Sequence, residues 1–179
     1  GENCEINNSK IDSCNIGNGV KVLSSTLKLS VVGNNSRIGP YAHLRENCKI
    51  GENCKIGNFV EIKQSQIGNN TKISHLAYVG NAKIGENCNI GCGVVFANYD
   101  GKNKFETQIG NNCFIGSNST LIAPLTIGNN CFICAGTVVV ESVPDNTFVI
   151  GRAKQENKFD RAEKYLKGKD NWNILEQME

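Results

Sequence analysis

The chain has 179 residues, 39% of them hydrophobic, which predicts one folded domain with its own core. Its 19 lysines and arginines nearly balance 17 aspartates and glutamates, and the formal net charge is +2. This balance excludes the strongly basic surface typical of proteins that bind nucleic acid or an anionic membrane. The sequence contains no apolar run long enough to span a bilayer and no signal segment at its start, so we expect no membrane partner.

The sequence is dominated by a short internal repeat. It opens with GENCEI, which already lies inside a repeat unit, so we expect a preceding N-terminal part. Aliphatic or aromatic anchors recur mostly six residues apart, at Ile38, Leu44, Ile50, Ile56, Ile62, Ile67, Ile73, Val79, Ile84, Ile90, Phe96, Ile109, Ile115, Leu121, Ile127, Ile133 and Val139. A small residue stands two positions before most anchors. Because side chains at i−2 and i share one side of a strand, both sets are predicted to point inward.

Seven of the nine cysteines occupy this small inward slot, namely Cys4, Cys14, Cys48, Cys54, Cys88, Cys113 and Cys131. In such a slot a free cysteine acts as a small buried hydrophobe. We therefore disfavour disulfide and zinc roles for them and expect a reducing compartment.

Three repeats form a larger period of about 18 residues. One anchor of each period is followed by glycine, at Gly33, Gly51, Gly68, Gly85, Gly110 and Gly128, and two positions later by asparagine, at Asn35, Asn53, Asn70, Asn87, Asn112 and Asn130. Both residue types accept a positive φ at a corner. The pattern predicts a parallel β-helix, a triangular prism with three short strands per coil and coils roughly 4.8 Å apart. It does not fix the handedness.

One coil is too long, because 25 residues separate Ile84 from Ile109. Seven or eight residues within ANYDGKNKFETQ are expected to leave the prism as a loop, a natural place for binding residues.

The repeat stops after Arg152. The segment ENKFDRAEKYLKG has helical spacing at Phe159, Ala162 and Leu166, with a candidate cap at Asn157 and a stop at Gly168. We predict a β-helix domain over 1–151 and a C-terminal arm with a helix over 152–179, packed on its own prism or on a neighbour.

Stacking the coils in register brings chemically interesting residues into columns. One column consists of the residues two positions after the anchors of one side of the prism. They are Pro40, Asn58, His75, Cys92, Ser117 and Ala135. The strip of small residues above His75 could seat a long thin ligand, or could reflect only the preference of turns for small residues. His75 suits a general base because imidazole titrates near neutral pH, although a corner histidine is more often structural. His43 lacks such a context and is interpreted as structural.

A second column places Arg45 one coil below Lys63. Two cations about 5 Å apart without an evident acidic partner in that slot favour an anion site, since their mutual repulsion is otherwise uncompensated. The alternative is a pair of solvated surface cations.

Five segments identify a resemblance that runs from about residue 31 to 152: GPYAHLR, GNFVEIK, HLAYVG, IGENCNIGCGVVFANYDGKNKFET and IGSNSTLIAPLTIG. They resemble the C-terminal half of the bifunctional N-acetylglucosamine-1-phosphate uridylyltransferase/glucosamine-1-phosphate N-acetyltransferase family. The resemblance implies a left-handed parallel β-helix, a homotrimer with acetyl-transfer sites between subunits, and acetyl-CoA as co-substrate. It also implies a bacterial cytoplasmic enzyme. The uridylyltransferase half is absent from this chain, and with it the reason to expect a metal.

The resemblance further implies residue roles. His75 aligns with the base that takes a proton from the sugar amine. Sugar-phosphate contacts align with Arg45, Lys63, Tyr78, Asn89 and Lys104. Acetyl-CoA contacts align with Cys92, Asn98, Tyr99, Ser117, Ala135 and Arg152. The chain departs from the family pattern at three positions, with Cys92 for alanine, Asn81 for aspartate and Glu46 for proline.

The sequence therefore predicts acetyl transfer from acetyl-CoA to glucosamine 1-phosphate, on the path to UDP-N-acetylglucosamine and cell-envelope polymers. Three alternatives stay open at this point. Another hexapeptide acyltransferase with a different amino-sugar acceptor would have little use for Arg45 and Lys63 if that acceptor lacked phosphate. A zinc carbonic anhydrase needs three imidazoles at each metal, and the chain has two histidines. A non-catalytic β-helix scaffold is disfavoured by the ejected loop and the stacked cations.

Overall fold

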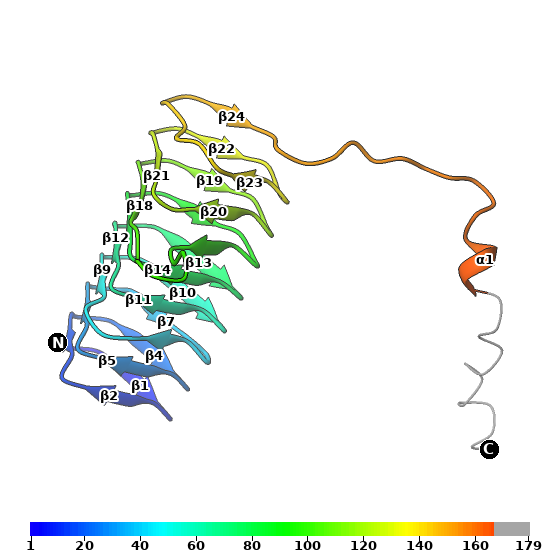
Figure 1. Ribbon diagram of the computed structural model, residues 1–179. Coiled ribbons are helices and arrows are strands. Elements are labelled where there is room, and N and C mark those ends of the chain that lie inside the picture. The colour runs from blue at the N-terminus through cyan, green and yellow to red at the C-terminus, as the bar shows by residue number, and fades with distance from the viewer. Residues whose placement is uncertain (167–179) are drawn as a thin grey trace, which may run out of the picture.

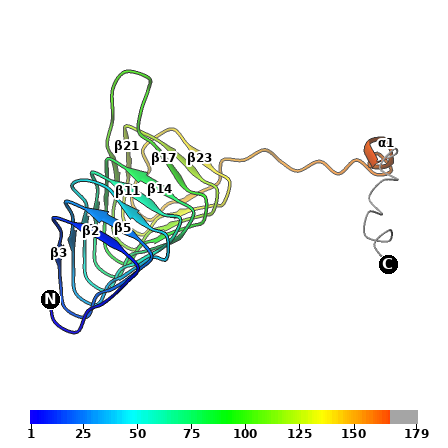
Figure 2. The same cartoon turned by 90° about the horizontal axis from the view of Figure 1, so that it is seen from below.

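The computed structural model describes residues 1–166, in which three parallel sheets form the sides of a triangular prism (Figures 1 and 2). Sheet A contains β1 (Glu5–Asn7), β4 (Lys21–Leu23), β7 (Arg37–Ile38), β10 (Lys55–Asn58), β13 (Lys72–His75), β16 (Asn89–Ile90), β19 (Phe114–Ile115), β22 (Phe132–Ile133) and β24 (Phe148–Val149). Sheet B contains β2 (Lys10–Asp12), β5 (Thr26–Lys28), β8 (His43–Leu44), β11 (Glu61–Lys63), β14 (Tyr78–Gly80), β17 (Val95–Ala97), β20 (Thr120–Ile122) and β23 (Val138–Val139). Sheet C contains β3 (Asn15–Ile16), β6 (Val31–Val32), β9 (Lys49–Ile50), β12 (Gln66–Ile67), β15 (Ala82–Ile84), β18 (Thr107–Ile109) and β21 (Leu125–Ile127).

Successive coils stack in the register that the repeat predicts. In sheet C, Ile50 pairs with Ile67, Ile67 with Ile84, and Ile84 with Ile109. Each strand is therefore followed, one coil later, by its hydrogen-bonded neighbour in the same sheet. This confirms the left-handed parallel β-helix.

The core is a stack of anchor side chains surrounded by small residues. Ile56, Ile73, Val79 and Phe96 have no exposed surface, and the small slot is buried along the central coils. All nine cysteines are free: Cys48, Cys54, Cys88, Cys113 and Cys131 are buried, while Cys4 and Cys14, in the first coil, are half-buried. The interpretation of the small-slot cysteines as packing residues agrees with this arrangement.

The corner between sheets C and A corrects one sequence-based expectation. The asparagines do take a positive φ, between 54° and 59° at Asn35, Asn53, Asn70, Asn87, Asn112 and Asn130, whereas the glycines before them do not. Glycine is required there by close approach, since a Cβ on Gly68 would lie 2.6 Å from the carbonyl carbon of Gly85 in the next coil. The repeated glycines therefore let the coils stack tightly, and asparagine supplies the left-handed turn at these six positions.

The long coil forms the expected loop, which projects from the side of the prism (the green segment in Figure 2). Tyr99 and Lys104 form an isolated antiparallel bridge across it, and the Asp100 carboxylate accepts hydrogen bonds from the backbone amides of Lys102 and Asn103 at 2.8 and 2.6 Å. These contacts are internal to the loop and hold its two sides together.

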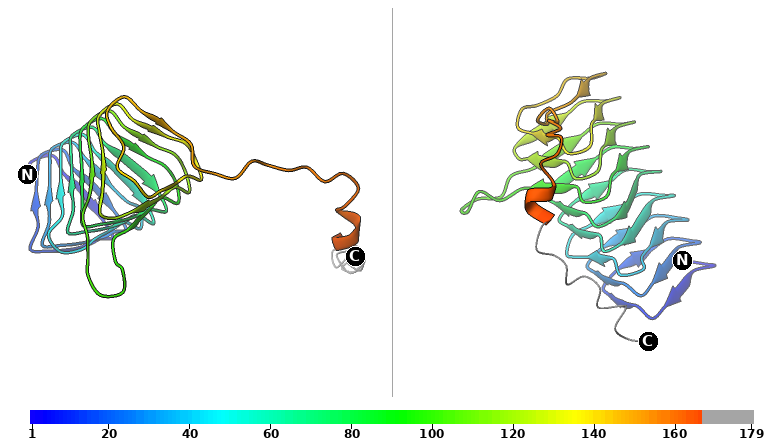
Figure 3. Two further views of the ribbon diagram at one scale, coloured as in Figure 1. Left: turned by 45° about the horizontal axis from the view of Figure 1, so that its top comes forward. Right: turned by 90° about the vertical axis from the view of Figure 1, so that its right-hand side faces the viewer.

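Beyond β24 the chain leaves the prism as an extended arm (Figures 1 and 3). The helix that the sequence places near Phe159–Leu166 is present only as α1 (Glu163–Leu166), and Phe159 and Tyr165 are 86% and 80% exposed. The predicted stop at Gly168 lies outside the described residues. No helix within residues 1–166 has the length and apolarity needed to cross a membrane.

Candidate functional site

The site is organised around His75, the last residue of β13, at the corner between sheets A and B. Its neighbour in the preceding coil is Asn58, which ends β10 and pairs with it in register. The two side chains are hydrogen-bonded, with 2.7 Å between His75 Nδ1 and Asn58 Oδ1. An amide oxygen can only accept, so Nδ1 carries a proton, and in the neutral imidazole the lone pair lies on Nε2. The arrangement therefore presents a proton-accepting nitrogen to solvent.

Above His75 the corner is lined with unpaired backbone amides. The N–H groups of Cys92, Ser117 and Ala135 have no hydrogen-bond partner among residues 1–166. At the corner between sheets C and A, side-chain oxygens of the next coil accept from the equivalent amides, as Asn111 Oδ1 does from Glu86 N at 2.8 Å. The small residues of this column supply no such oxygen, so its amides remain free for a ligand.

Arg152 closes the upper end of this column. Its Nη1 donates to the carbonyl oxygen of Ala135 at 2.7 Å, although it lies beyond the last strand in sequence. The structure thus brings together Cys92, Ser117, Ala135 and Arg152 along one edge of the prism, extending upward from His75.

Three cations gather on sheet B. Lys63 lies in the coil above Arg45, and Lys104 reaches it from the projecting loop; Arg45 and then Lys104 lower the pKa of Lys63 through charge repulsion. The structure corrects one expectation here, because Arg45 does have an acidic partner: its Nη1 lies 3.1 Å from Glu61 Oε1. This hydrogen bond raises the pKa of Arg45, so its charge is firmly held. Lys63 and Lys104 have no such partner within the described residues, and the cluster remains suited to an anion.

Tyr78 links the cations to the corner. It opens β14, and its hydroxyl lies against Gly80, the residue that pairs with Lys63. Sheet B forms one narrow side of the prism. Lys63 and His75 therefore lie at opposite ends of this side, with Tyr78 between them. A small phosphorylated ligand lying over this side could contact all three.

Asn98 and Tyr99, at the base of the loop, differ in their surroundings. Asn98 is 5% exposed and donates from Nδ2 to Asn81 Oδ1 at 2.7 Å, whereas Tyr99 is 59% exposed and donates to the Gly101 carbonyl. Asn81 stands where the family pattern has aspartate, and it still offers a side-chain oxygen that orients Asn98.

The structure does not bring every sequence-predicted residue into one cluster. Asn89 points outward from sheet A, where it pairs with Lys72, and is thus around the corner from Lys63. Two residues were missed as site residues, namely Asn58 and Glu61. Each had a signal, since Asn58 stands in the His75 column and Glu61 shares the outward side of β11 with Lys63.

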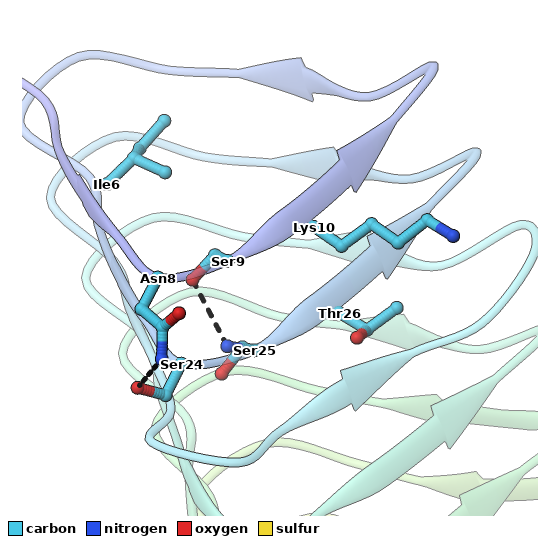
Figure 4. A pocket seen from close by; sticks show the side chains of 7 residues that line it. All are labelled: Ile6, Asn8, Ser9, Lys10, Ser24, Ser25 and Thr26. Carbon is cyan, nitrogen blue, oxygen red and sulfur yellow. Dashed lines mark hydrogen bonds between the residues drawn. The ribbon is translucent and has the colours of Figure 1, made fainter.

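A depression elsewhere on the surface has fewer groups that are free to bind a ligand or take part in catalysis. It lies in the two lowest coils, lined by Ile6, Asn8, Ser9, Lys10, Ser24, Ser25 and Thr26 (Figure 4). Its hydroxyls are used internally, as in the hydrogen bond from Ser25 N to Ser9 Oγ at 3.1 Å. Residues 1–166 hold no group of three or more histidine, cysteine or acidic side chains placed to bind a metal ion.

The parallel β-helix with a six-residue repeat places the chain in the class of hexapeptide-repeat transferases. The chain belongs to the family described as "Bacterial transferase hexapeptide (six repeats)", whose pattern matches residues 30–64, 65–98 and 106–140.

Individual relatives agree with this assignment. The chain is 51% identical over 166 residues to the bifunctional protein GlmU of Acholeplasma laidlawii, covering 93% of this chain and 35% of that protein. It is 48% identical over 152 residues to the GlmU protein of Streptococcus agalactiae, covering 85% of this chain and 33% of that one. The chain thus spans about a third of these relatives. Among solved structures, a perosamine N-acetyltransferase mutant from Caulobacter crescentus, complexed with CoA and GDP-perosamine, has a TM-score of 0.59 and 26% identity over 69% of this chain and 57% of that one.

Proposed function

We propose that the protein is an acetyl-CoA-dependent glucosamine-1-phosphate N-acetyltransferase. The observation that carries the proposal is the His75–Asn58 hydrogen bond, which in the neutral imidazole places the lone pair on Nε2, beside a sheet side bearing Arg45, Lys63 and Lys104. The GlmU relatives, about 50% identical to this chain, support the same assignment. The product would enter the synthesis of UDP-N-acetylglucosamine for the cell envelope, in a bacterial cytoplasm.

The acceptor is held by its phosphate. In glucosamine 1-phosphate the phosphate and the amine are on neighbouring ring carbons, so fixing one fixes the other. Arg45 offers a bidentate donor, Lys63 and Lys104 offer point charges, and the hydroxyl of Tyr78 lies between them and the corner. Asn89, outward on sheet A, completes the sugar contacts from the far side of the corner.

Acetyl-CoA lies along the corner above His75. The free amides of Ser117 and Ala135 pair with its extended amide-containing arm, the free amide of Cys92 faces its thioester carbonyl, and the Arg152 guanidinium meets its phosphates at the upper end. Asn98 and Tyr99 contact acetyl-CoA from the base of the projecting loop. Small side chains in this column leave room for the arm to approach the backbone.

The reaction is direct attack of the amine on the thioester carbonyl. His75 Nε2 accepts a proton as the new carbon–nitrogen bond forms, and the Cys92 N–H holds the negative charge that develops on the carbonyl oxygen. Breaking the carbon–sulfur bond then releases CoA thiolate, to which the imidazolium returns the proton. Cys92 acts through its amide, and its thiol takes no covalent part.

We further propose that three copies assemble with these sites between subunits, since a convex prism corner cannot enclose its ligands alone. The test of the function is thiol release from acetyl-CoA in the presence of glucosamine 1-phosphate. His75→Ala should lower kcat roughly 10²- to 10⁴-fold with a modest change in KM. A near-normal kcat in this variant would refute the base assignment.

A second candidate is acetylation of another amino sugar. The 26% identity to the acetyltransferase crystallised with CoA and GDP-perosamine favours it. Nucleotide-linked amino sugars in the same assay decide between the two, because the preferred acceptor should give the higher kcat/KM.

A further inference from the structure

The outward side of sheet A carries a row of stacked cations in its lower half. Lys21, Arg37, Lys55 and Lys72 stand on β4, β7, β10 and β13, and each pairs in register with the next (Figure 1). Since neighbouring coils are roughly 4.8 Å apart, the row is about 14 Å long. All four side chains are exposed. We call these four residues the cation ladder.

The upper three cations of the ladder are not neutralised. Lys21 forms an ion pair at 2.8 Å with Glu5, its register partner in the coil below. Arg37, Lys55 and Lys72 form no ion pair with any residue in 1–166. Like charges directly opposite each other in a sheet are destabilising. The cation ladder therefore lowers the stability of the fold.

On sheet C the outward lysines are arranged differently. Gln66 pairs in register with Lys49 below it and with Lys83 above it, so an uncharged side chain separates the two lysines. Lys83 in addition forms an ion pair with Glu106 at 3.1 Å. Because sheet C separates or pairs its cations, the unpaired row on sheet A is not a requirement of the repeat. A row of charges that lowers stability without such a requirement indicates a use outside the fold.

The cation ladder runs beside the column that contains His75. Lys55 and Asn58 are three residues apart in β10, as are Lys72 and His75 in β13, so the two columns run parallel about 10 Å apart. Above Lys72 its register partner is Asn89, the sheet A contact of the proposed acceptor site. The ladder therefore leads up to that contact from below.

We propose that the cation ladder captures the phosphorylated acceptor and guides it to the His75 corner; this inference rests on the proposed function. A phosphate monoester carries nearly two negative charges at pH 7, and a row of cations attracts it along the whole row. The formal net charge of the chain is only +2, so the attraction comes from this local row.

The extent of the ladder favours a small anion. Above Asn89 the same outward column continues with uncharged Phe114, Phe132 and Phe148, so the row of cations ends next to the acceptor site. A nucleic acid or a large acidic protein would be favoured by a basic surface that is wider than one column. The ladder is therefore matched to a phosphorylated sugar that moves along it.

The test compares two variants of the full chain, Lys55→Glu and Lys49→Glu. Lys49 is the matched control, because it is an exposed outward lysine on sheet C, next to uncharged Val31 and Gln66. Both substitutions change the net charge equally, but only Lys55→Glu reverses a charge within the ladder. Any difference between the variants therefore reports on the position of the charge.

The first measurement is kcat/KM for glucosamine 1-phosphate at saturating acetyl-CoA. For a dianion about 10–15 Å from the reversed charge, Lys55→Glu should lower kcat/KM roughly three- to sevenfold at an ionic strength of about 0.01 M. At about 0.15 M the loss should shrink to roughly twofold or less, because salt screens the attraction. The loss should appear in KM with kcat unchanged, since Lys55 contacts none of the reacting atoms.

The second measurement is Tm at the lower ionic strength. Lys55→Glu should raise Tm, because it places a carboxylate between Arg37 and Lys72, whereas Lys49→Glu should stay near the wild type. A higher Tm together with a lower kcat/KM distinguishes lost capture from damage to the fold. Equal kcat/KM in the two variants, or a loss that does not depend on ionic strength, would overturn the inference.

Inorganic triphosphate separates this inference from the proposed function, because its binding needs no acetyl transfer. The rise in Tm that it causes should be smaller in Lys55→Glu than in Lys49→Glu. A wild type that transfers no acetyl group, while the two variants differ in this way, would contradict the function alone. An active wild type whose two variants agree in kcat/KM and in the response to triphosphate would contradict the capture role alone.

Discussion

Replacing Asn58 by leucine removes the acceptor that fixes the His75 tautomer while nearly preserving side-chain volume. The hydrogen bond is short, at 2.7 Å, but joins the side chain of half-buried Asn58 to the exposed ring of His75. Such a bond contributes about 0.5–1.5 kcal/mol net. Because each 1.36 kcal/mol in a barrier is a factor of ten, loss of the bond should lower kcat roughly 2- to 13-fold.

The assay is steady-state thiol release with both substrates varied. Because Asn58 orients the base and does not bind the phosphate, Asn58→Leu should lower kcat with little change in either KM. Asn58→Asp, which keeps an acceptor oxygen at the same place, should restore most of the activity. Wild-type kcat in Asn58→Leu, or a loss as large as that of His75→Ala, would refute the positioning role.

Three further predictions concern stability and reactivity. The positive charges around Lys63 lower its pKa, and a bound anion would relieve their repulsion, so inorganic phosphate should raise Tm by a few degrees at neutral pH. This rise in Tm should become smaller as the pH increases through the lowered pKa of Lys63, and it should be smaller in Lys104→Met than in the wild type. Equal rises in the two proteins would contradict the anion site. Gly68→Ala should lower the free energy of unfolding in urea by about 1–3 kcal/mol, since its Cβ would collide with the next coil; wild-type stability would refute the stacking argument. Burial raises the pKa of the Cys113 thiol to about 11, so in the native protein a thiol reagent should label half-buried Cys92 much faster than buried Cys113. Equal labelling rates of the two thiols would contradict the packing role of Cys113.

The fold was largely predictable because the repeat encodes it several times over. An anchor such as Ile67 is surrounded by equivalent anchors one coil away on either side, so each coil confirms the register of the next. The role of the corner glycines was predicted wrongly for a physical reason. Gly68 is limited by the distance to the neighbouring coil, which a φ-based argument on one coil does not contain.

The candidate site was only partly predictable. The vertical columns place Arg45 near Lys63 and Asn58 near His75 from sequence alone. The ion pair between Arg45 and Glu61 was missed, because the two residues stand in different columns of adjacent coils. Their contact depends on the conformation of the long arginine side chain, which the repeat does not determine. The approach of Lys104 was expected from the resemblance, since the path of a projecting loop does not follow from the repeat.

The most direct test of the account compares two acceptors, glucosamine 1-phosphate and unphosphorylated glucosamine, in acetyl transfer by the same protein. A cation cluster that holds the phosphate while His75 takes the proton predicts strong turnover of the phosphorylated sugar and a kcat/KM lower by several orders of magnitude without the phosphate. Equal turnover of the two sugars, or turnover of neither, would contradict the account.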